Sequence, residues 1–178
     1  MDPESGPRSA ILTIGHSTRS LAELIELLRV HGVTRLVDVR TLPRSVRHPH
    51  FNRDRLTTGL VASGIAYEHR PALGGLRKPR ADSINLGLRS PGFRGFADHM
   101  QTRAFADALH DLIMRARLER IAFMCAEADP WHCHRSLIAD ALVARGIPVL
   151  HVLGVEPPVA HRLHPSARSV EHRVVYPR

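Results

Sequence analysis

The sequence contains only two cysteines, Cys125 and Cys133, among its 178 residues. Small secreted domains that depend on disulfides carry many more, so no disulfide framework is implied and a reducing cytoplasm is the expected location. No apolar run approaches the roughly 20 residues that a membrane-spanning helix needs. The polar, proline-containing start MDPESGPRSA does not have the pattern of a signal peptide. These absences predict a cytoplasmic protein without a membrane partner.

Aromatic residues make up 4% of the chain, and this scarcity argues against an open stacking platform for single-stranded nucleic acid. Two common phosphate-binding fingerprints are also missing. The segment LGGLRK lacks the spacing of a Walker A loop, and no G-x-G-x-x-G follows the first predicted strand. A nucleotide or nucleic-acid ligand would therefore be held by another arrangement of residues.

The charge of the chain is strongly basic, at +8 overall, and it is unevenly distributed. Residues 40–103 hold 12 Lys or Arg against four acids, whereas the rest of the chain holds 13 of each sign. This middle third carries the whole excess, which favours a nucleotide or nucleic acid as partner. Its start, DVRTLPRSVRHPHFNRDR, is either a solvated basic loop or an anion clamp of arginine side chains that bind phosphate.

Apolar runs alternate with helical patterns along most of the chain. Strands are predicted at residues 9–17, 34–40, 65–70, 120–127 and 147–154. The first helical pattern begins with a capping box, Ser20 and Glu23, and the pattern over residues 96–119 is expected to break near Thr102. This alternation predicts an α/β three-layer sandwich with a mainly parallel sheet of about five strands.

The domain organisation is predicted from composition. Residues 1–8 are expected to be a disordered N-terminus and residues 9–155 a single α/β domain. Within it, residues 71–95 are rich in Gly and Pro and lack periodicity, which predicts a basic loop insertion. Residues 156–178, rich in Pro, His and Arg, form a C-terminal tail to which the pattern assigns no structure.

The two cysteines are predicted to differ in character. Cys125 lies in an apolar strand, where a free cysteine packs as a small hydrophobic residue. Cys133 precedes a helix, whose N–H groups and dipole favour a thiolate, and His132, His134 and Arg135 flank it. Cys133 is therefore predicted to be a nucleophile or redox-active thiol. The alternative is an ordinary residue at a helix start.

Zinc is the alternative cofactor, although none is expected. Cys and His suit zinc, and the candidate ligands are Cys125, Cys133, His134 and His16. The seven residues between the two cysteines exceed the spacing of a typical zinc knuckle, and no second pair completes the site.

Five motifs in register, TIGHS, DVRTLPRS, GIAYEHRPALGG, RGFADHM and FMCAEADPWHCHRSLIADAL, resemble the domain-of-unknown-function 488 family of small bacterial and archaeal proteins. The resemblance runs from about Ile11 to Val152 and implies no particular reaction. It implies that the recurrent polar positions of the family fall here on His16, Ser17, Asp38, Arg40, Pro43, Ser45, Tyr67, Gly74, Gly75, Cys125, Glu127, Cys133, His134 and Arg135.

Several of these residues follow the ends of predicted strands, where ligands bind in parallel sheets. We predict an enzyme that acts on a nucleotide or nucleic acid there, with Cys133 as the reactive thiol and His16, Glu127 and His134 in proton transfer. The residues predicted to bind the anion or substrate are Ser17, Asp38, Arg40, Arg44, Arg47, Tyr67 and Arg135. Asp38 and Arg40 also have a structural interpretation, as a pair with each other. The alternative function is a non-catalytic module that binds nucleic acid or zinc through the same residues.

Overall fold

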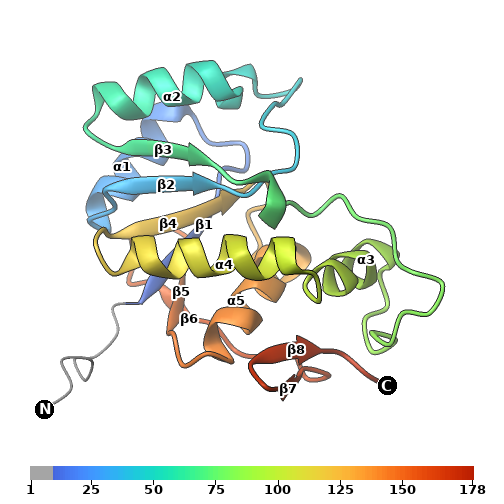
Figure 1. Ribbon diagram of the computed structural model, residues 1–178. Coiled ribbons are helices and arrows are strands. Elements are labelled where there is room, and N and C mark those ends of the chain that lie inside the picture. Colours follow the sequence, from blue (N-terminus) through green and yellow to red (C-terminus); the bar gives the residue numbers. More distant parts are fainter. Residues whose placement is uncertain (1–9) are drawn as a thin grey trace, which may run out of the picture.

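Strands and helices alternate as predicted in a computed structural model, which describes residues 10–178 (Figure 1). Five parallel strands form the sheet in the order β3-β2-β4-β1-β5. They are β1 (Ile11–Gly15), β2 (Arg35–Asp38), β3 (Ala66–His69), β4 (Ile121–Cys125) and β5 (Val149–Val152). A short strand that the sequence pattern did not predict, β6 (Val159–Ala160), pairs antiparallel with β5. Residues 1–8, which were predicted to be a disordered N-terminus, lie outside the part of the chain that the structure describes.

Helices cover both faces of this sheet, so the predicted three-layer α/β class is confirmed (Figure 1). One face carries α1 (Leu21–Val30) and α2 (Arg53–Ala62), and the other carries α4 (Arg103–Ala116) and α5 (Arg135–Val143). Thr102 caps α4 and separates it from α3 (Pro91–His99), which confirms the predicted break. Between residues 10 and 178, no helix is both long and apolar enough to cross a membrane.

Side-chain alternation along the strands sends residues at the carboxyl edge to opposite faces. In β4, Phe123 and Cys125 join the hydrophobic cluster under α4 and α5, whereas Met124 joins the cluster under α1 and α2. In β1, Ile14 belongs to the α1 and α2 side, and His16, two residues on, stacks there on Phe51. Because successive side chains of a strand point to opposite faces, His16 and Cys125 share an edge but not a face.

The C-terminal tail packs against α5. It forms a hairpin of β7 (Arg168–Val170) and β8 (Arg173–Val175). Beyond the hairpin, Tyr176 is fully buried, and its hydroxyl donates to Asp140 of α5 at 2.8 Å. The backbone N–H of Tyr176 donates to the Asn85 side chain at 2.9 Å, in the segment predicted as an insertion. The tail therefore ties α5 to the 71–95 segment, in which regular structure is confined to η2 (Pro71–Leu73) and the start of α3.

Gly15 ends β1 beneath the loop that follows β4. A Cβ at this position would lie 1.7 Å from the carbonyl oxygen of Glu127, while Gly15 is held in register with Cys125. Gly15→Ala should therefore lower the free energy of unfolding by at least about 2 kcal/mol, measured by urea denaturation. Gly154→Ala is the control, because no atom lies within 4 Å of its Cβ, and it should change stability by less than about 0.5 kcal/mol. Equal stability of the two variants would contradict this packing.

Candidate functional site

A pocket of about 560 Å³ opens at the carboxyl edge of the sheet. Its volume lies within the range of about 300–1,000 Å³ typical of small-molecule sites. Cys125, Cys133 and His134 lie along it, together with the loops that follow β2 and β4, part of the segment before α3, and the start of α3 itself. The pocket therefore brings the sulfur-containing stretch of the sequence together with part of the basic segment.

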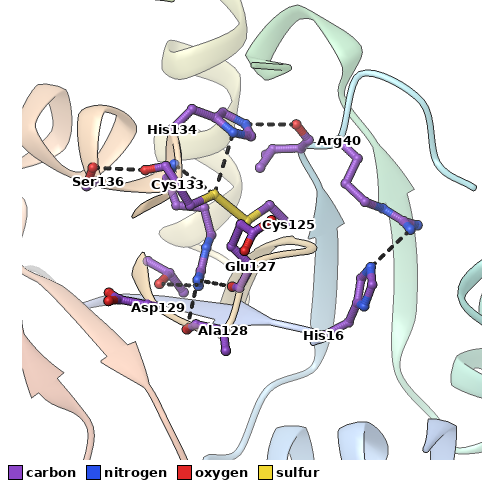
Figure 2. The surroundings of a disulfide bond; sticks show 12 residues. His16, Arg40, Cys125, Glu127, Ala128, Asp129, Cys133, His134 and Ser136 are labelled. Carbon is purple, nitrogen blue, oxygen red and sulfur yellow. Dashed lines mark hydrogen bonds between the residues drawn. A yellow bond between two sulfur atoms is a disulfide. The ribbon is translucent and has the colours of Figure 1, made fainter. Parts of the chain in front are cut away.

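The two cysteine sulfurs meet at this pocket, where the structure joins them in a disulfide (Figure 2). Cys125 ends β4, and Cys133 lies between η3 (Pro130–His132) and α5. The two residues are only 2% and 4% exposed, so a reagent reaches the sulfurs through the pocket. The sequence pattern predicts two separate thiols, one in the core and one at a helix start. The structure differs because the β4–α5 loop folds back on the strand end.

Cys133 has two polar neighbours at the start of α5. The backbone N–H of Arg135 donates to its Sγ at 3.5 Å, and Nδ1 of His134 lies 3.6 Å from the same atom. The other ring nitrogen of His134, Nε2, donates to the carbonyl of Val39 at 3.1 Å. Since a carbonyl only accepts, Nδ1 carries a lone pair that faces the sulfur. In the dithiol state, this lone pair would accept the S–H of Cys133.

The charges around Cys133 differ from those expected from the sequence. Burial lowers the pKa of His134 to about 4, against the opposing hydrogen bond to Val39, so the ring is neutral near pH 7. His132 is exposed and binds Asp129 at 2.7 Å. The backbone N–H of Arg135 and the start of the helix therefore remain as the groups that stabilise a thiolate at Cys133.

Two adjacent glycines allow the His134 ring to pack closely. A Cβ on Gly75 would lie 2.6 Å from the ring of His134, and a Cβ on Gly74 would lie 2.3 Å from Oγ1 of Thr41. The backbone of this loop therefore packs directly against the site, with no side chain in between. The sequence pattern pointed to these glycines only through the family resemblance.

The Arg135 guanidinium turns away from the pocket into the interior, where the residue is 1% exposed. It donates to the carbonyls of Glu127 at 2.6 Å and Ala128 at 3.3 Å, and to Thr13 Oγ1 at 3.1 Å. Burial lowers its pKa to about 10, which leaves it charged at neutral pH. Its predicted contact with substrate finds no support in this geometry, and the side chain instead fixes the β4–α5 loop.

A buried chain of hydrogen bonds continues behind Arg135, and no motif in the sequence predicts it. Thr13 lies 2.7 Å from Nδ1 of His151, whose Nε2 lies 2.9 Å from Nδ1 of His161. His161 in turn donates to Asp140 at 2.7 Å. The donors run in one direction, from the Arg135 cation through Thr13 and two imidazoles to the Asp140 carboxylate. The carboxylates that favour the charge of the guanidinium itself are those of Asp129 and Glu127.

A second group of polar side chains lies on the face of the sheet that α1 and α2 cover, and its members hydrogen-bond to one another. Arg40 binds both carboxylate oxygens of Asp38, at 2.6 Å for the shortest contact, and donates to the carbonyl of Phe51 at 2.9 Å. The Tyr67 hydroxyl donates to Asp38 at 2.8 Å. Burial and the negative charge of Asp38 raise the pKa of Tyr67 well above its usual range. The interpretation in which Asp38 and Arg40 pair with each other is therefore confirmed, and their side chains serve the fold.

His16 and Ser17 belong to this closed group and not to the pocket. Nδ1 of His16 donates to the Ser17 carbonyl at 2.9 Å, and Nε2 accepts from Arg40 at 3.4 Å, so both ring nitrogens are engaged. Burial lowers the pKa of His16 to about 4. Figure 2 shows the ring turned toward Arg40 and away from the sulfurs. The shared edge predicted for His16 and Cys125 is confirmed, but strand alternation separates their side chains.

Glu127 and Arg44 are the exposed charged side chains along the pocket. Within residues 10–178, neither side chain has a hydrogen bond or an ion pair. Arg47 is also exposed but lies outside the pocket lining. Arg40 also lines the pocket, but its guanidinium is bound to Asp38 and to the carbonyl of Phe51, so Arg44 is the member of the predicted anion clamp whose side chain is open to a ligand there.

The candidate zinc ligands do not come together. In the part of the chain that the structure describes, no group of three or more His, Cys, Asp or Glu side chains is placed to hold a metal ion. His16 lies on the other face of the sheet, and the two sulfurs are bonded to each other.

The fold and the site define an α/β domain with a cysteine–histidine pocket at the carboxyl edge of a parallel sheet. A family model described as "Domain of unknown function DUF488" matches residues 20–142, more than two thirds of the chain. The protein therefore belongs to this family, as the sequence motifs predicted. No curated protein and no solved structure matches the chain.

Buried neutral imidazoles should make the protein sensitive to acid. Burial lowers the pKa of His16 and His134 to about 4 and that of His151 to about 3, from an ordinary value of 6.5. Between these values the unfolded chain binds more protons, so stability is full above about pH 6.5 and falls as the pH drops toward 4. The urea midpoint should therefore decrease across this window.

Two variants test this origin of the acid sensitivity. His134→Gln removes one buried titrating group, so the midpoint should depend less steeply on pH. His110→Gln removes an exposed histidine on α4 and should leave the dependence unchanged. A midpoint that stays constant from neutral pH to about pH 4.5 would contradict burial of neutral histidines.

Proposed function

We propose that this protein is an enzyme whose reaction centre is the sulfur of Cys133 and whose substrate is a small anionic molecule of about nucleotide size. One observation carries the proposal: Sγ of Cys133 lies at the pocket with the Arg135 N–H at 3.5 Å and the His134 Nδ1 lone pair at 3.6 Å. An amide donor at a helix start favours a thiolate, and an imidazole acceptor orients the thiol.

The pocket lining supports an anionic substrate that also has an apolar or ring-shaped part. Leu42, Leu76 and Phe93 supply apolar surface, and Arg44 supplies a cation without a partner among the described residues. A free guanidinium binds phosphate or carboxylate through two parallel N–H donors. Glu127 lies along the same pocket and repels the anionic end, which orients a ligand toward Arg44. The charge excess of residues 40–103 raises the local concentration of anions.

The second candidate is a non-catalytic module that binds nucleic acid. The concentration of the whole net charge in residues 40–103 favours it, as do the exposed arginines Arg44 and Arg47. The buried sulfurs and the closed Asp38–Arg40 group have no role in such a module. The zinc version has no set of ligands within residues 10–178.

Alkylation of the reduced protein tests the reaction centre. Iodoacetamide should modify Cys133 before Cys125, with an apparent pKa below the free value of about 8.5, because only Cys133 has the helix N–H. Adenosine monophosphate, the probe ligand, should slow this reaction, and Arg44→Ala should weaken the protection about tenfold through the loss of one charged contact. Arg29→Ala on α1 removes the same charge elsewhere and should not. Faster labelling of Cys125 would overturn the assignment.

Salt dependence separates the two candidates. If the basic segment binds nucleic acid, the log–log slope of affinity against salt should fall by about 0.9 for each phosphate contact removed. Replacing Arg44, Arg47, Arg53 and Arg55 with Gln should flatten the slope for duplex and single-stranded DNA. Absence of binding at low salt would reject the nucleic-acid module and leave the small-molecule enzyme.

A further inference from the structure

The chain contains two cysteines, and both sulfurs lie at one pocket within bonding contact. We propose a cytoplasmic location, because two cysteines supply no framework of disulfides of the kind that secreted domains depend on. Thiol pools there keep cysteines reduced, so disulfides that form are usually transient and serve catalysis or redox sensing. A bond at a substrate pocket, and not in a remote part of the core, fits a catalytic use.

The two sulfurs have different surroundings, as an exchange reaction requires. Cys133 Sγ accepts the N–H of Arg135 and faces the lone pair of His134. Cys125 Sγ has no hydrogen bond among the described residues and lies in the hydrophobic cluster with Phe123. In the reduced state, the more stabilised sulfur has the larger thiolate fraction, and the thiolate is the form that attacks a disulfide. Cys133 is thus the exchanging sulfur and Cys125 the resolving one.

We propose that this pair carries out thiol–disulfide exchange with disulfides of small anionic thiols. This rests on the proposed function, since both use Cys133 as the reacting sulfur, and it supplies the reaction class that the proposed function leaves open. Access sets the size of the substrate: residues that are 2% and 4% exposed, reached through a pocket, are open to a small disulfide and closed to one within a folded protein.

The reaction balances in two displacements. The Cys133 thiolate attacks one sulfur of the substrate disulfide, forms a mixed disulfide and releases the first substrate thiolate. The Cys125 thiol loses its proton to water or to the departing thiolate and attacks Cys133 Sγ, which releases the second. The protein gives up two electrons and two protons, and the substrate disulfide becomes two thiols. Two molecules of substrate thiol reverse both steps and restore the dithiol.

Charge selects the substrate. Arg44, without a partner in the described chain, is placed to bind a carboxylate or phosphate of the substrate at the pocket. The two sources of negative charge are distinguished by the probe: glutathione disulfide carries carboxylates and coenzyme A disulfide carries phosphates. Cystamine, a disulfide with ammonium groups, is the cationic comparison.

The experiment measures how fast the reduced full-length protein loses its thiols to each of these disulfides, with samples quenched by alkylation and read by mass spectrometry. At least one anionic disulfide should react tenfold or more faster than cystamine, and the product should contain the Cys125–Cys133 bond. Arg44→Ala should slow the anionic reaction about tenfold and should not slow the reaction of cystamine, whose ammonium groups the guanidinium repels, whereas Arg29→Ala should change neither. Cys133→Ser should abolish exchange.

Trapping identifies the attacking sulfur. Cys125→Ala, a substitution that keeps a small apolar side chain in the core, should stop at a mixed disulfide on Cys133. If that variant does not fold, the order is read from the wild type as a transient adduct on Cys133 before the internal bond. Reaction at the rate of free cysteine for all probes, or adducts without the internal bond, would overturn the proposal. Fast alkylation of Cys133 without exchange would leave the proposed function and reject this one. Exchange with an anionic disulfide, without protection of Cys133 by adenosine monophosphate, would support thiol–disulfide exchange and reject the nucleotide-sized ligand of the proposed function.

Discussion

Neighbouring side chains of a β-strand point to opposite faces of the sheet, and this alternation decides which polar residues meet at the carboxyl edge. Cys125 follows Phe123 toward α5, where it meets Cys133, whereas His16 follows Ile14 toward α1 and α2. One edge thus supports two unlike arrangements. On one face, sulfur and imidazole line a pocket, and on the other, an arginine–aspartate pair holds strands and loops together.

The loop between β4 and α5 keeps the sulfurs in place, and the buried side chain of Arg135 holds this loop. Arg135 binds two carbonyls of this loop and the hydroxyl of Thr13, and the carboxylates of Asp129 and Glu127 favour its charged form. A buried cation costs free energy unless its donors and its charge are satisfied. Nη1 and Nη2 of the guanidinium have acceptors, whereas Nε is buried without one, so the acceptors of the loop and of Thr13 offset only part of this cost.

The sequence predicted the order of strands and helices because apolar periodicity and capping residues are local signals. It also predicted the shared edge of His16, Asp38 and Cys125, since parallel strands bring their carboxyl ends together. It did not reveal which face each side chain takes, because strands buried on both faces, such as IAFMC, are apolar throughout. The Cys125–Cys133 bond depends on how the intervening loop folds back. The packing of Tyr176 on Asp140 likewise depends on contacts distant in sequence.

The account of the site depends on the contact between the two sulfurs, and peptide mapping without reduction tests it most directly. The protein, exposed to glutathione disulfide, is cleaved at Glu127 or Trp131, between the cysteines, and analysed by mass spectrometry before and after reduction. The account predicts a cross-linked pair of peptides that carries Cys125 and Cys133 and separates on reduction. Recovery of both cysteines as unlinked peptides, each free or bound to glutathione, would contradict it.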